Sequence, residues 1–464
     1  MSEDDDSAKY QITVGRNVIC SGEIKDPTTA VGRMPGTDEC LRRARVRIGT
    51  MLKIDNVSFL LGAGASMHAG GVTFGGFPIP IERDLVEAAA PEQDAQGKQP
   101  SHSWLSLFYE TASLVTNRPY SCEERCQALS TPGKEEPPRI EVNFEEYLSQ
   151  LYAWSAGMTS GVEILKLGIK EEGKEELLLR RDSLDALIKH ITRSLVNQLD
   201  LPKKMEGESD PLRVHKKFLK KILTRPLNLR RAAIFTLNYD TLLEQAADAE
   251  GIMLVDGFVG TLHRSFRPEC YDMDFYFPGQ TTEGRVHRYD RAAHLYKLHG
   301  STSWHRSEEE GHLFATSEKN PDDVVIFPTG AKYGQTLAMP YAELFRRFAS
   351  TVAQPQSILF AIGYGFGDEH VNTLIRQALS VPSFTLVVVD PAPKSDFVAA
   401  LRQHQDERTW LVTGGLGRFQ SFVDYLLPDL HEEDIERQIE QTLSDLDSST
   451  KRGSENSERA SNEQ

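Results

Sequence analysis

Two polar segments that follow apolar runs carry side chains capable of acid–base chemistry. Asn238 and Asp240 come just after the run at residues 232–236, and His299 comes after the run at residues 296–298. A carboxamide can hold a water molecule or a hydroxyl by hydrogen bonds without adding charge. A histidine, which titrates near neutral pH, can take a proton from that hydroxyl. Asp240 could bind a second hydroxyl or orient the loop.

Each of these residues also has a structural interpretation. Residues 241–247 read as a helix, and Asn is a favoured N-cap, so Asn238 could serve only as a cap. His299 could be a histidine that is merely satisfied at a strand end. Gly300 beside it favours instead a close approach of the backbone to a ligand.

A Gly-rich turn follows a third apolar run, at residues 57–61. Residues 62–66 read Gly-Ala-Gly-Ala-Ser. The glycines allow positive φ and leave room for a ligand. A helix beginning near Ser66 would point free N–H groups at a diphosphate. The spacing is not the dehydrogenase fingerprint, because Met67 stands where the third glycine would be. A turn with a purely structural role is the alternative.

Two further apolar runs end in the same manner. Residues 357–362 lead into Gly-Tyr-Gly-Phe-Gly-Asp, and residues 385–389 lead into Asp390. Asp390 could accept hydrogen bonds from a ribose or simply start a turn before proline. Asp368 is expected to cap the helix at residues 369–379. Because the carboxyl ends of parallel strands converge on one crevice, all five endings predict a single site.

The motifs Gly-Ala-Gly-Ala-Ser, Thr-x-Asn-Tyr-Asp, Leu-His-Gly-Ser and Gly-Tyr-x-Phe-Gly-Asp occur in this order. This combination resembles the sirtuin-like NAD-consuming family, and most closely its bacterial branch that hydrolyses NAD in antiviral defence. The resemblance spans about residues 52–392. It implies a Rossmann-like domain with Asn238 and His299 as catalytic residues at the nicotinamide–ribose bond. NAD is the expected substrate, and the residues predicted to bind it are Gly62, Ala63, Gly64, Ser66, Thr236, Asp240, Gly363, Tyr364, Gly365 and Asp390.

The chain departs from the sirtuin deacylases in several places. Their zinc module needs two Cys-x-x-Cys pairs. Here the five cysteines are scattered, at Cys20, Cys40, Cys122, Cys126 and Cys270. The histidines at 263, 305 and 312 have no metal-ligand spacing, so we expect no metal. The sirtuin Ile-Pro-Asp-Phe-Arg segment is absent, and Leu237 replaces the Gln that precedes the Asn. These differences weaken a deacylase interpretation and leave the NAD site itself in place.

The predicted function is therefore an NAD glycohydrolase that depletes NAD when activated in antiphage defence. An NAD-dependent protein deacylase and a non-enzymatic sensor of NAD or ADP-ribose remain alternatives. The resemblance also implies regulation through a homo-oligomer or through a hexameric HerA-type DNA-translocating ATPase.

The sequence predicts an α/β fold: a Rossmann-like parallel sheet with an inserted helical subdomain and no zinc ribbon. Residues 1–50 are interpreted as an N-terminal extension and residues 51–430 as the NAD-binding domain. Within it, helical periodicity marks an insertion at approximately residues 85–225, expected to cover the crevice as a lid. Residues 431–464 are expected to form an acidic helix and a disordered tail.

Composition bounds the remaining possibilities. The 464 residues are 39% hydrophobic, with a formal net charge of −16, and the mean hydropathy is −0.41. No 18-residue apolar span and no basic signal-peptide start are present. Five unpatterned cysteines fit a reducing cytosol, so a cytoplasmic location is expected. The acidic balance predicts neither membrane association nor direct nucleic-acid binding.

Overall fold

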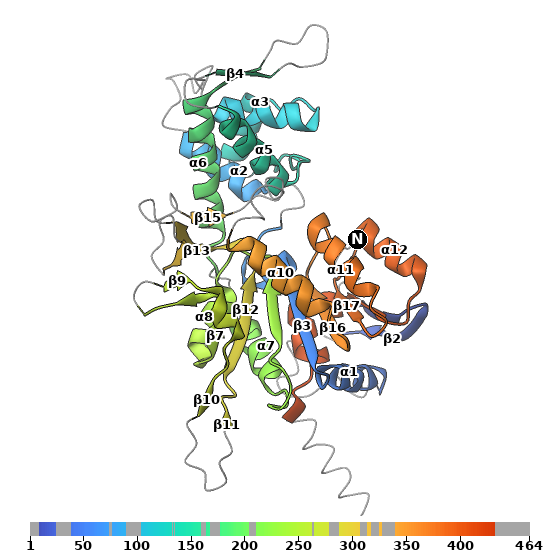
Figure 1. Ribbon diagram of the computed structural model, residues 1–464. Coiled ribbons are helices and arrows are strands. Elements are labelled where there is room, and N and C mark those ends of the chain that lie inside the picture. Colours follow the sequence, from blue (N-terminus) through green and yellow to red (C-terminus); the bar gives the residue numbers. More distant parts are fainter. Residues whose placement is uncertain are drawn as a thin grey trace, which may run out of the picture.

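The computed structural model (Figure 1) describes most of the chain. The described residues are 9–24, 39–73, 77–89, 104–131, 133, 135–158, 164–167, 177–203, 210–261, 264–277, 287–306, 313–316, 324–326 and 339–431.

A nine-stranded sheet forms the centre of the molecule, in the order β2-β1-β18-β17-β16-β3-β6-β12-β7. All neighbouring pairs from β18 to β7 are parallel. The predicted α/β class with a mostly parallel sheet is thus confirmed. The strands are β1 (Lys9–Val14), β2 (Asn17–Glu23), β3 (Asn56–Leu61), β6 (Ala233–Thr236), β7 (Met253–Val255), β12 (Ala292–Lys297), β16 (Ser357–Ile362), β17 (Thr385–Val389) and β18 (Thr409–Gly414).

The N-terminal segment is part of this sheet. β1 pairs antiparallel with β18, and Tyr10 lies opposite Gly414. The side chains of Tyr10, Ile12 and Cys20 are buried in the core beneath the sheet. Helix α1 (Glu39–Leu52) packs its buried face into the same core. The boundary predicted at residue 50 therefore does not separate two structural units.

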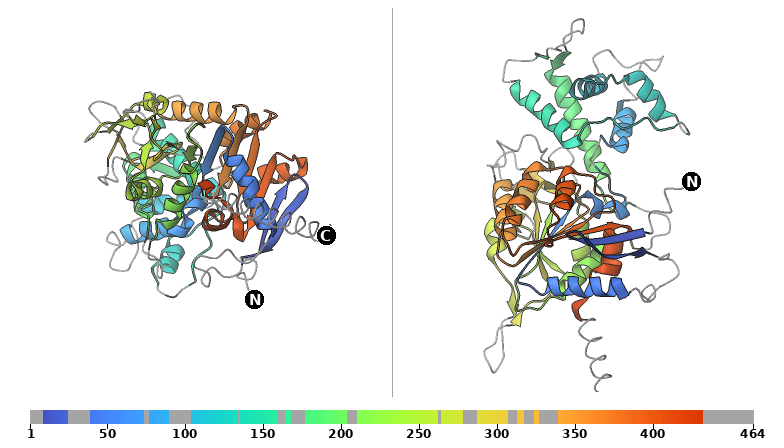
Figure 2. Two further views of the ribbon diagram at one scale, coloured as in Figure 1. Left: turned by 90° about the horizontal axis from the view of Figure 1, so that it is seen from below. Right: turned by 90° about the vertical axis from the view of Figure 1, so that its right-hand side faces the viewer.

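Helices cover both faces of the sheet (Figure 2). Because successive strand residues point to opposite faces, Phe59 and Phe360 lie in one core while Leu60 and Leu359 lie in the other. The first face carries α1, α7 (Arg213–Leu223) and α8 (Leu242–Glu250), together with the short segments α13 (Phe419–Ser421) and η8 (Phe422–Leu426). The second face carries α10 (Tyr341–Val352), α11 (Glu369–Leu379) and α12 (Asp396–His404).

A helical subdomain is inserted between β3 and β6 and stands at one end of the sheet (Figure 1). Its own core is built by α2 (Ile79–Ala89), α3 (Trp104–Thr116), α5 (Phe144–Gly157) and α6 (Arg181–Gln198). It also contains α4 (Cys122–Ser130) and the hairpin β4 (Ile164–Leu167) and β5 (Leu177–Arg180).

The limits of this insertion differ from the predicted 85–225. It starts with α2 at Ile79 and its last helix ends at Gln198. The next helix, α7, packs on the sheet, where Phe218 contacts Phe59 with ring centroids 5.2 Å apart. An amphipathic helix has the same periodicity wherever its apolar face packs, so sequence periodicity could not separate α7 from the subdomain.

A smaller five-stranded sheet, in the order β15-β13-β14-β9-β8, lies beside the main one. Its strands are β8 (Phe258–Val259), β9 (Arg264–Phe266), β13 (Gly300–Arg306), β14 (Leu313–Ala315) and β15 (Val324–Ile326). A separate hairpin pairs β10 (Tyr276–Phe277) with β11 (His287–Arg288). Short 3₁₀ turns are η2 (Ala63–Ala65), η3 (Met67–Ala69), η5 (Pro268–Asp272) and η7 (Gly415–Gly417).

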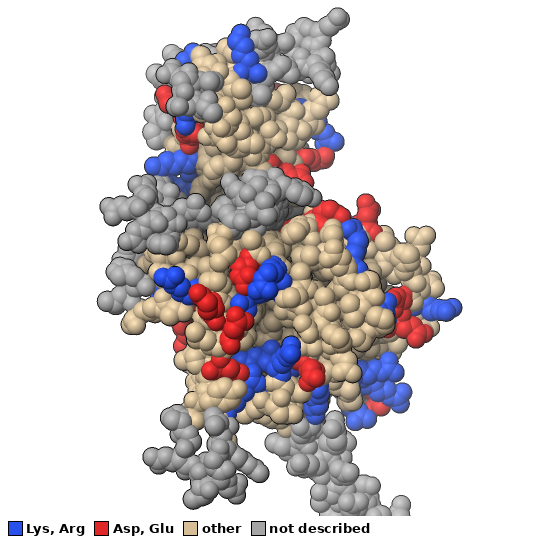
Figure 3. Space-filling view, in the orientation of Figure 1, with Lys and Arg blue, Asp and Glu red and all other residues tan. Residues whose placement is uncertain are grey.

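The predicted acidic helix and tail lie outside the described residues, except for His431. None of the helices in the described ranges has both the length and the apolar character needed to cross a bilayer. On the face shown in Figure 3, basic and acidic side chains of the described residues are interspersed over the sheet domain.

Candidate functional site

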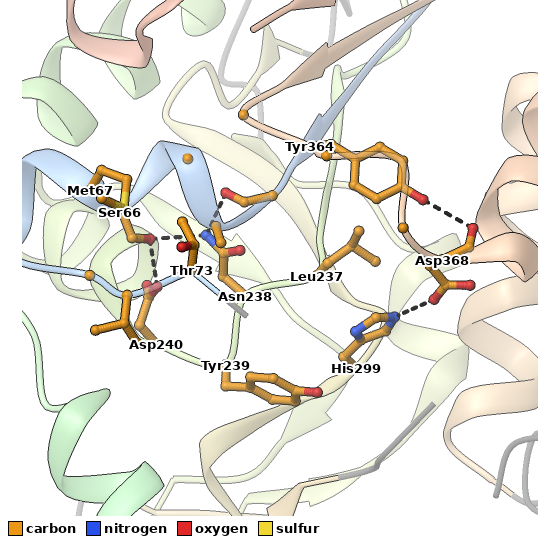
Figure 4. A pocket seen from close by; sticks show the side chains of 18 of the residues that line it. Ser66, Met67, Thr73, Leu237, Asn238, Tyr239, Asp240, His299, Tyr364 and Asp368 are labelled. Carbon is orange, nitrogen blue, oxygen red and sulfur yellow. Dashed lines mark hydrogen bonds and ion pairs between the residues drawn. The ribbon is translucent and has the colours of Figure 1, made fainter. Parts of the chain in front are cut away.

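A cavity of about 780 Å³ opens at the carboxyl ends of the central strands. Its size lies within the range of small-molecule sites. The residues predicted from sequence that line it are Gly62, Ala63, Gly64, Ser66, Asn238, Asp240, His299, Gly363, Tyr364, Gly365 and Asp390. Five strand endings far apart in the sequence thus meet in one place, as parallel strand order requires. Figure 4 shows this arrangement.

Thr236 is the predicted binding residue that does not line the cavity. Its hydroxyl oxygen accepts a hydrogen bond from the Asn238 backbone N–H at 3.0 Å. The same hydroxyl donates to the carbonyl oxygen of Leu61 at 3.2 Å. Thr236 therefore ties β6 to β3 and shapes the start of the Asn238 loop, which gives it a structural role. Its predicted contact with the ligand stays a prediction.

The Gly-rich turn needs its glycines mainly for packing. A Cβ at Gly62 would lie 2.6 Å from the Gly363 carbonyl oxygen, and one at Gly64 would lie 2.6 Å from the Gly363 Cα. Gly363 itself has a φ of +60°, and a Cβ there would lie 2.7 Å from Ala65 N. The turns after β3 and β16 thus pack backbone against backbone, which leaves no space for side chains.

The expected phosphate-binding helix near Ser66 is not formed. Residues 63–65 and 67–69 form two short 3₁₀ turns. The backbone N–H groups of Gly62, Gly64, Ala65 and Ser66 donate to carbonyl oxygens within the turn or to the neighbouring turn after β16. These four donors are already used within the protein. The prediction of a helix beginning near Ser66 was therefore wrong, whereas the binding of a diphosphate by this turn stays a prediction.

The side-chain amide of Asn238 is held by the Gly-rich turn. Its Nδ2 atom donates to the Gly62 carbonyl oxygen at 3.0 Å and to Ser66 Oγ at 2.9 Å. With both amide hydrogens engaged, Oδ1 is the part of the side chain that can meet a ligand in the cavity. Asn238 is not the cap of α8, because the N-cap residue is Thr241. The cap-only interpretation is therefore excluded.

Asp240 orients the loop. One carboxylate oxygen accepts the Ser66 hydroxyl at 2.6 Å, and the other accepts the Leu242 N–H at 3.1 Å. Below it, the buried Lys297 ammonium donates to the Asp240 carbonyl oxygen and to Glu244 Oε1, the latter at 2.8 Å. Of the two roles considered for Asp240, the structure favours loop orientation. Sequence reasoning missed Lys297, although a lysine that ends a buried strand is an unusual signal.

His299 is paired with Asp368. The ring Nε2 atom lies 3.0 Å from Asp368 Oδ2, and both side chains are buried, at 2% and 8% exposure. The other carboxylate oxygen, Oδ1, accepts the backbone N–H groups of His370 and Val371 and so caps α11. The predicted cap is confirmed, but sequence reasoning missed the contact with His299, which lies 69 residues away.

The loop after β16 is the open part of the cavity wall. The Tyr364 hydroxyl donates to Asn372 Oδ1 at 3.0 Å and anchors the loop to α11. No described atom lies within 4 Å of the position that a Cβ would take at Gly365 or Gly367. These two glycines, rather than Gly62 and Gly64, leave room for a ligand to approach the backbone.

Asp390 forms the predicted turn before proline and also lies at the cavity. Its Oδ1 atom accepts the Ala392 N–H at 2.8 Å, which forms the expected turn. The residue also lines the cavity, and burial raises the pKa of its carboxyl group. Its hydrogen bond to a ribose stays a prediction.

The helical subdomain contributes directly to the cavity wall. Asn143 and Glu146 at the start of α5, and Leu199 and Leu201 after α6, line it. Asn143 Oδ1 accepts the Glu146 N–H at 3.3 Å, a hydrogen bond typical of a helix N-cap. Tyr239, in the loop after β6, packs into the subdomain core. A movement of this subdomain would therefore change the wall of the cavity.

The cavity wall is acidic. Among the described residues that line it, the charged side chains are the carboxylates of Glu146, Asp240, Asp368, Glu369 and Asp390, with no lysine or arginine. Such a wall favours a ligand with a positive charge close to Asn238 and His299.

No group of three or more potential metal ligands occurs among the described residues. Residues 263 and 312 lie outside the described ranges. The His305 ring is buried and stacks on Phe314.

The sequence model of a SIR2-like domain matches residues 232–412. This segment contains Asn238, His299, Asp368 and Asp390, whereas the Gly-rich turn precedes it. No curated protein matches the chain.

Solved structures of Sir2 homologues are similar to parts of the fold. A Sir2 homologue–NAD complex has 11% identity and a TM-score of 0.38, covering 84% of this chain and 94% of that chain. A triple mutant bound to 2′-O-acetyl ADP-ribose has 11% identity and a TM-score of 0.35, covering 86% and 97%. A mutant bound to ADP-ribose has 9% identity and a TM-score of 0.31, covering 78% and 95%.

Proposed function

We propose that this protein is an NAD glycohydrolase that cleaves the bond between nicotinamide and ribose. The observation that carries the proposal is the meeting of the Asn238 carboxamide and the His299 imidazole in one cavity at the carboxyl edge of the sheet. The match of residues 232–412 to a SIR2-like domain supports NAD as the substrate.

In the proposed reaction, a water molecule held by Asn238 attacks the anomeric carbon of the ribose. The new carbon–oxygen bond forms as the carbon–nitrogen bond breaks, and the electron pair leaves on nicotinamide, which becomes neutral. His299 takes the proton of the attacking water. The acidic wall favours both the pyridinium cation of NAD and the oxocarbenium character of the transition state.

We further propose that the enzyme acts in the cytoplasm as an effector of antiphage defence. Uncontrolled NAD hydrolysis would kill the host cell, so the activity must be gated. Assembly of a homo-oligomer, or binding of a HerA-type ATPase, is the proposed trigger. The helical subdomain would transmit this trigger to the site, because it lines the cavity and also packs around Tyr239 of the loop after β6.

The test is a nicotinamide-release assay with purified protein and NAD, alone and with the products of neighbouring genes. Asn238→Ala and His299→Ala are each expected to reduce the rate on the order of 10²-fold or more. Asn17→Ala and His404→Ala, two exposed positions, are matched controls that should keep the wild-type rate. Equal rates for Asn238→Ala and wild type would remove Asn238 from the mechanism.

Two other outcomes would replace the proposal. Nicotinamide release that requires an acylated peptide would show a deacylase. Binding of NAD without turnover in every mixture would show a sensor.

A further inference from the structure

The geometry points to Asp368 as the positioning residue that sets the tautomer and the orientation of His299. This inference rests on the proposed function, since it assigns a role within the same site. Asp368 reaches the site from the N-terminus of α11, on a different element from either predicted catalytic residue. It touches the histidine and is not required to touch the substrate (Figure 4).

The two carboxylate oxygens of Asp368 have different partners. Oδ1 accepts the N–H groups of His370 at 2.9 Å and Val371 at 3.2 Å. These two donors and the helix dipole stabilise the charged form of the carboxylate. Oδ2 is directed at His299 Nε2, 3.0 Å away.

An ionised carboxylate can only accept hydrogen bonds, so Nε2 of His299 must carry the proton. In the neutral imidazole, Nδ1 then holds the lone pair and is the nitrogen that can accept a proton. When it does so, the imidazolium is stabilised by the buried carboxylate next to it. A carboxylate that orients a catalytic histidine acts in the same way in hydrolytic triads.

The competing interpretation is that Asp368 is only a helix cap, and substitutions can separate the two roles. Asp368→Asn keeps a good capping oxygen but turns an amide N–H₂ toward His299 Nε2. That group donates, so the proton of the ring is forced onto Nδ1. Asp368→Ser also caps α11 but leaves His299 without its carboxylate. Ser395→Ala is the matched control, because Ser395 caps α12 by accepting the Val398 N–H.

The first measurement is nicotinamide release. Asp368→Asn and Asp368→Ser are expected to lower kcat by about 10²- to 10⁴-fold with little change in KM and in the melting temperature. Ser395→Ala should lower the melting temperature and keep kcat. The double variant of His299→Ala with Asp368→Ser should be no slower than His299→Ala alone, because Asp368 acts through the histidine.

The second measurement does not depend on activity. Nitrogen NMR of histidine-labelled protein, assigned with His299→Gln, should show the proton on Nε2 in the wild type and on Nδ1 in Asp368→Asn. A wild-type rate for Asp368→Asn, or an unchanged tautomer, would overturn the role of Asp368. Absence of nicotinamide release from the wild type in every mixture would instead contradict the proposed function, and the NMR result would still decide on Asp368.

Discussion

Ser66 Oγ donates a hydrogen bond to Asp240 Oδ2 at 2.6 Å and accepts one from Asn238 Nδ2 at 2.9 Å. One buried hydroxyl thus joins the turn after β3 to the loop after β6. It fixes the plane of the Asn238 amide and, through Asp240, the start of α8. The functional geometry of Asn238 therefore depends on a residue 172 positions earlier in the chain.

Ser66→Ala is expected to loosen Asn238 without removing it. The substitution removes the hydrogen bond of Asp240 Oδ2 and one of the two hydrogen bonds of Asn238 Nδ2, at a cost of about 1–3 kcal/mol in the free energy of unfolding. Nicotinamide release should also fall, since the amide is held less firmly. Urea unfolding and the release assay measure the two effects. A variant with wild-type kcat would show that Ser66 does not position Asn238.

Gly64→Ala should be much more destabilising than Gly365→Ala. The new Cβ at residue 64 would lie 2.6 Å from the Gly363 Cα, whereas at residue 365 no described atom lies within 4 Å. Overpacking of this kind typically costs about 1–3 kcal/mol. Thermal unfolding of the two variants tests the contrast. Equal melting temperatures would mean that the two glycine turns do not pack as described.

Acid should destabilise the protein through His68 and His215. Their rings stack with centroids 5.0 Å apart, and burial lowers the pKa of His68 to about 4 and that of His215 to about 3. The unfolded chain, with an ordinary histidine pKa near 6.5, binds these protons first. Stability is therefore full above about pH 6.5 and falls as the pH drops toward 4, by at most about 3–5 kcal/mol per histidine.

The check on this pH dependence is urea unfolding from pH 7 to pH 4. His215→Phe removes one of the two groups, so the loss of stability on acidification should be smaller than in the wild type. His404→Ala removes an exposed histidine and should leave the wild-type pH dependence unchanged. If the free energy of unfolding of His215→Phe falls with pH as steeply as that of the wild type, His215 is not a source of the acid sensitivity.

The helical subdomain contains a buried ion pair, and removing one of its two members alone should destabilise the protein. Arg125 contacts both oxygens of Glu82, at 2.6 and 2.7 Å, and Glu82 also accepts the Tyr109 hydroxyl. Arg125→Met leaves the buried Glu82 carboxylate without its cation and should cost about 3–5 kcal/mol. Adding Glu82→Gln should recover part of that loss. A double-mutant cycle by thermal unfolding measures the coupling, and strictly additive effects would rule out a direct pair.

The strand endings and their chemistry follow from local patterns in the amino-acid sequence. Apolar runs followed by Gly, Asn, His or Asp are local patterns, and the parallel sheet brings such endings to one edge. The fold class, the helical insertion and the cap at Asp368 could be predicted for this reason. Each depends on residues close to one another in the chain.

The pairs of groups that meet across the cavity are set by contacts between distant elements. The pairing of His299 with Asp368, the anchoring of Asn238 by Ser66 and the packing of Gly64 on Gly363 all join separate strands. The placement of β1 beside β18 and of α7 on the sheet is of the same kind. Such contacts depend on the packing of distant elements, which spacing within one segment does not encode. For that reason the contact of Asp368 with His299 and the role of Lys297 emerged only from the folded chain.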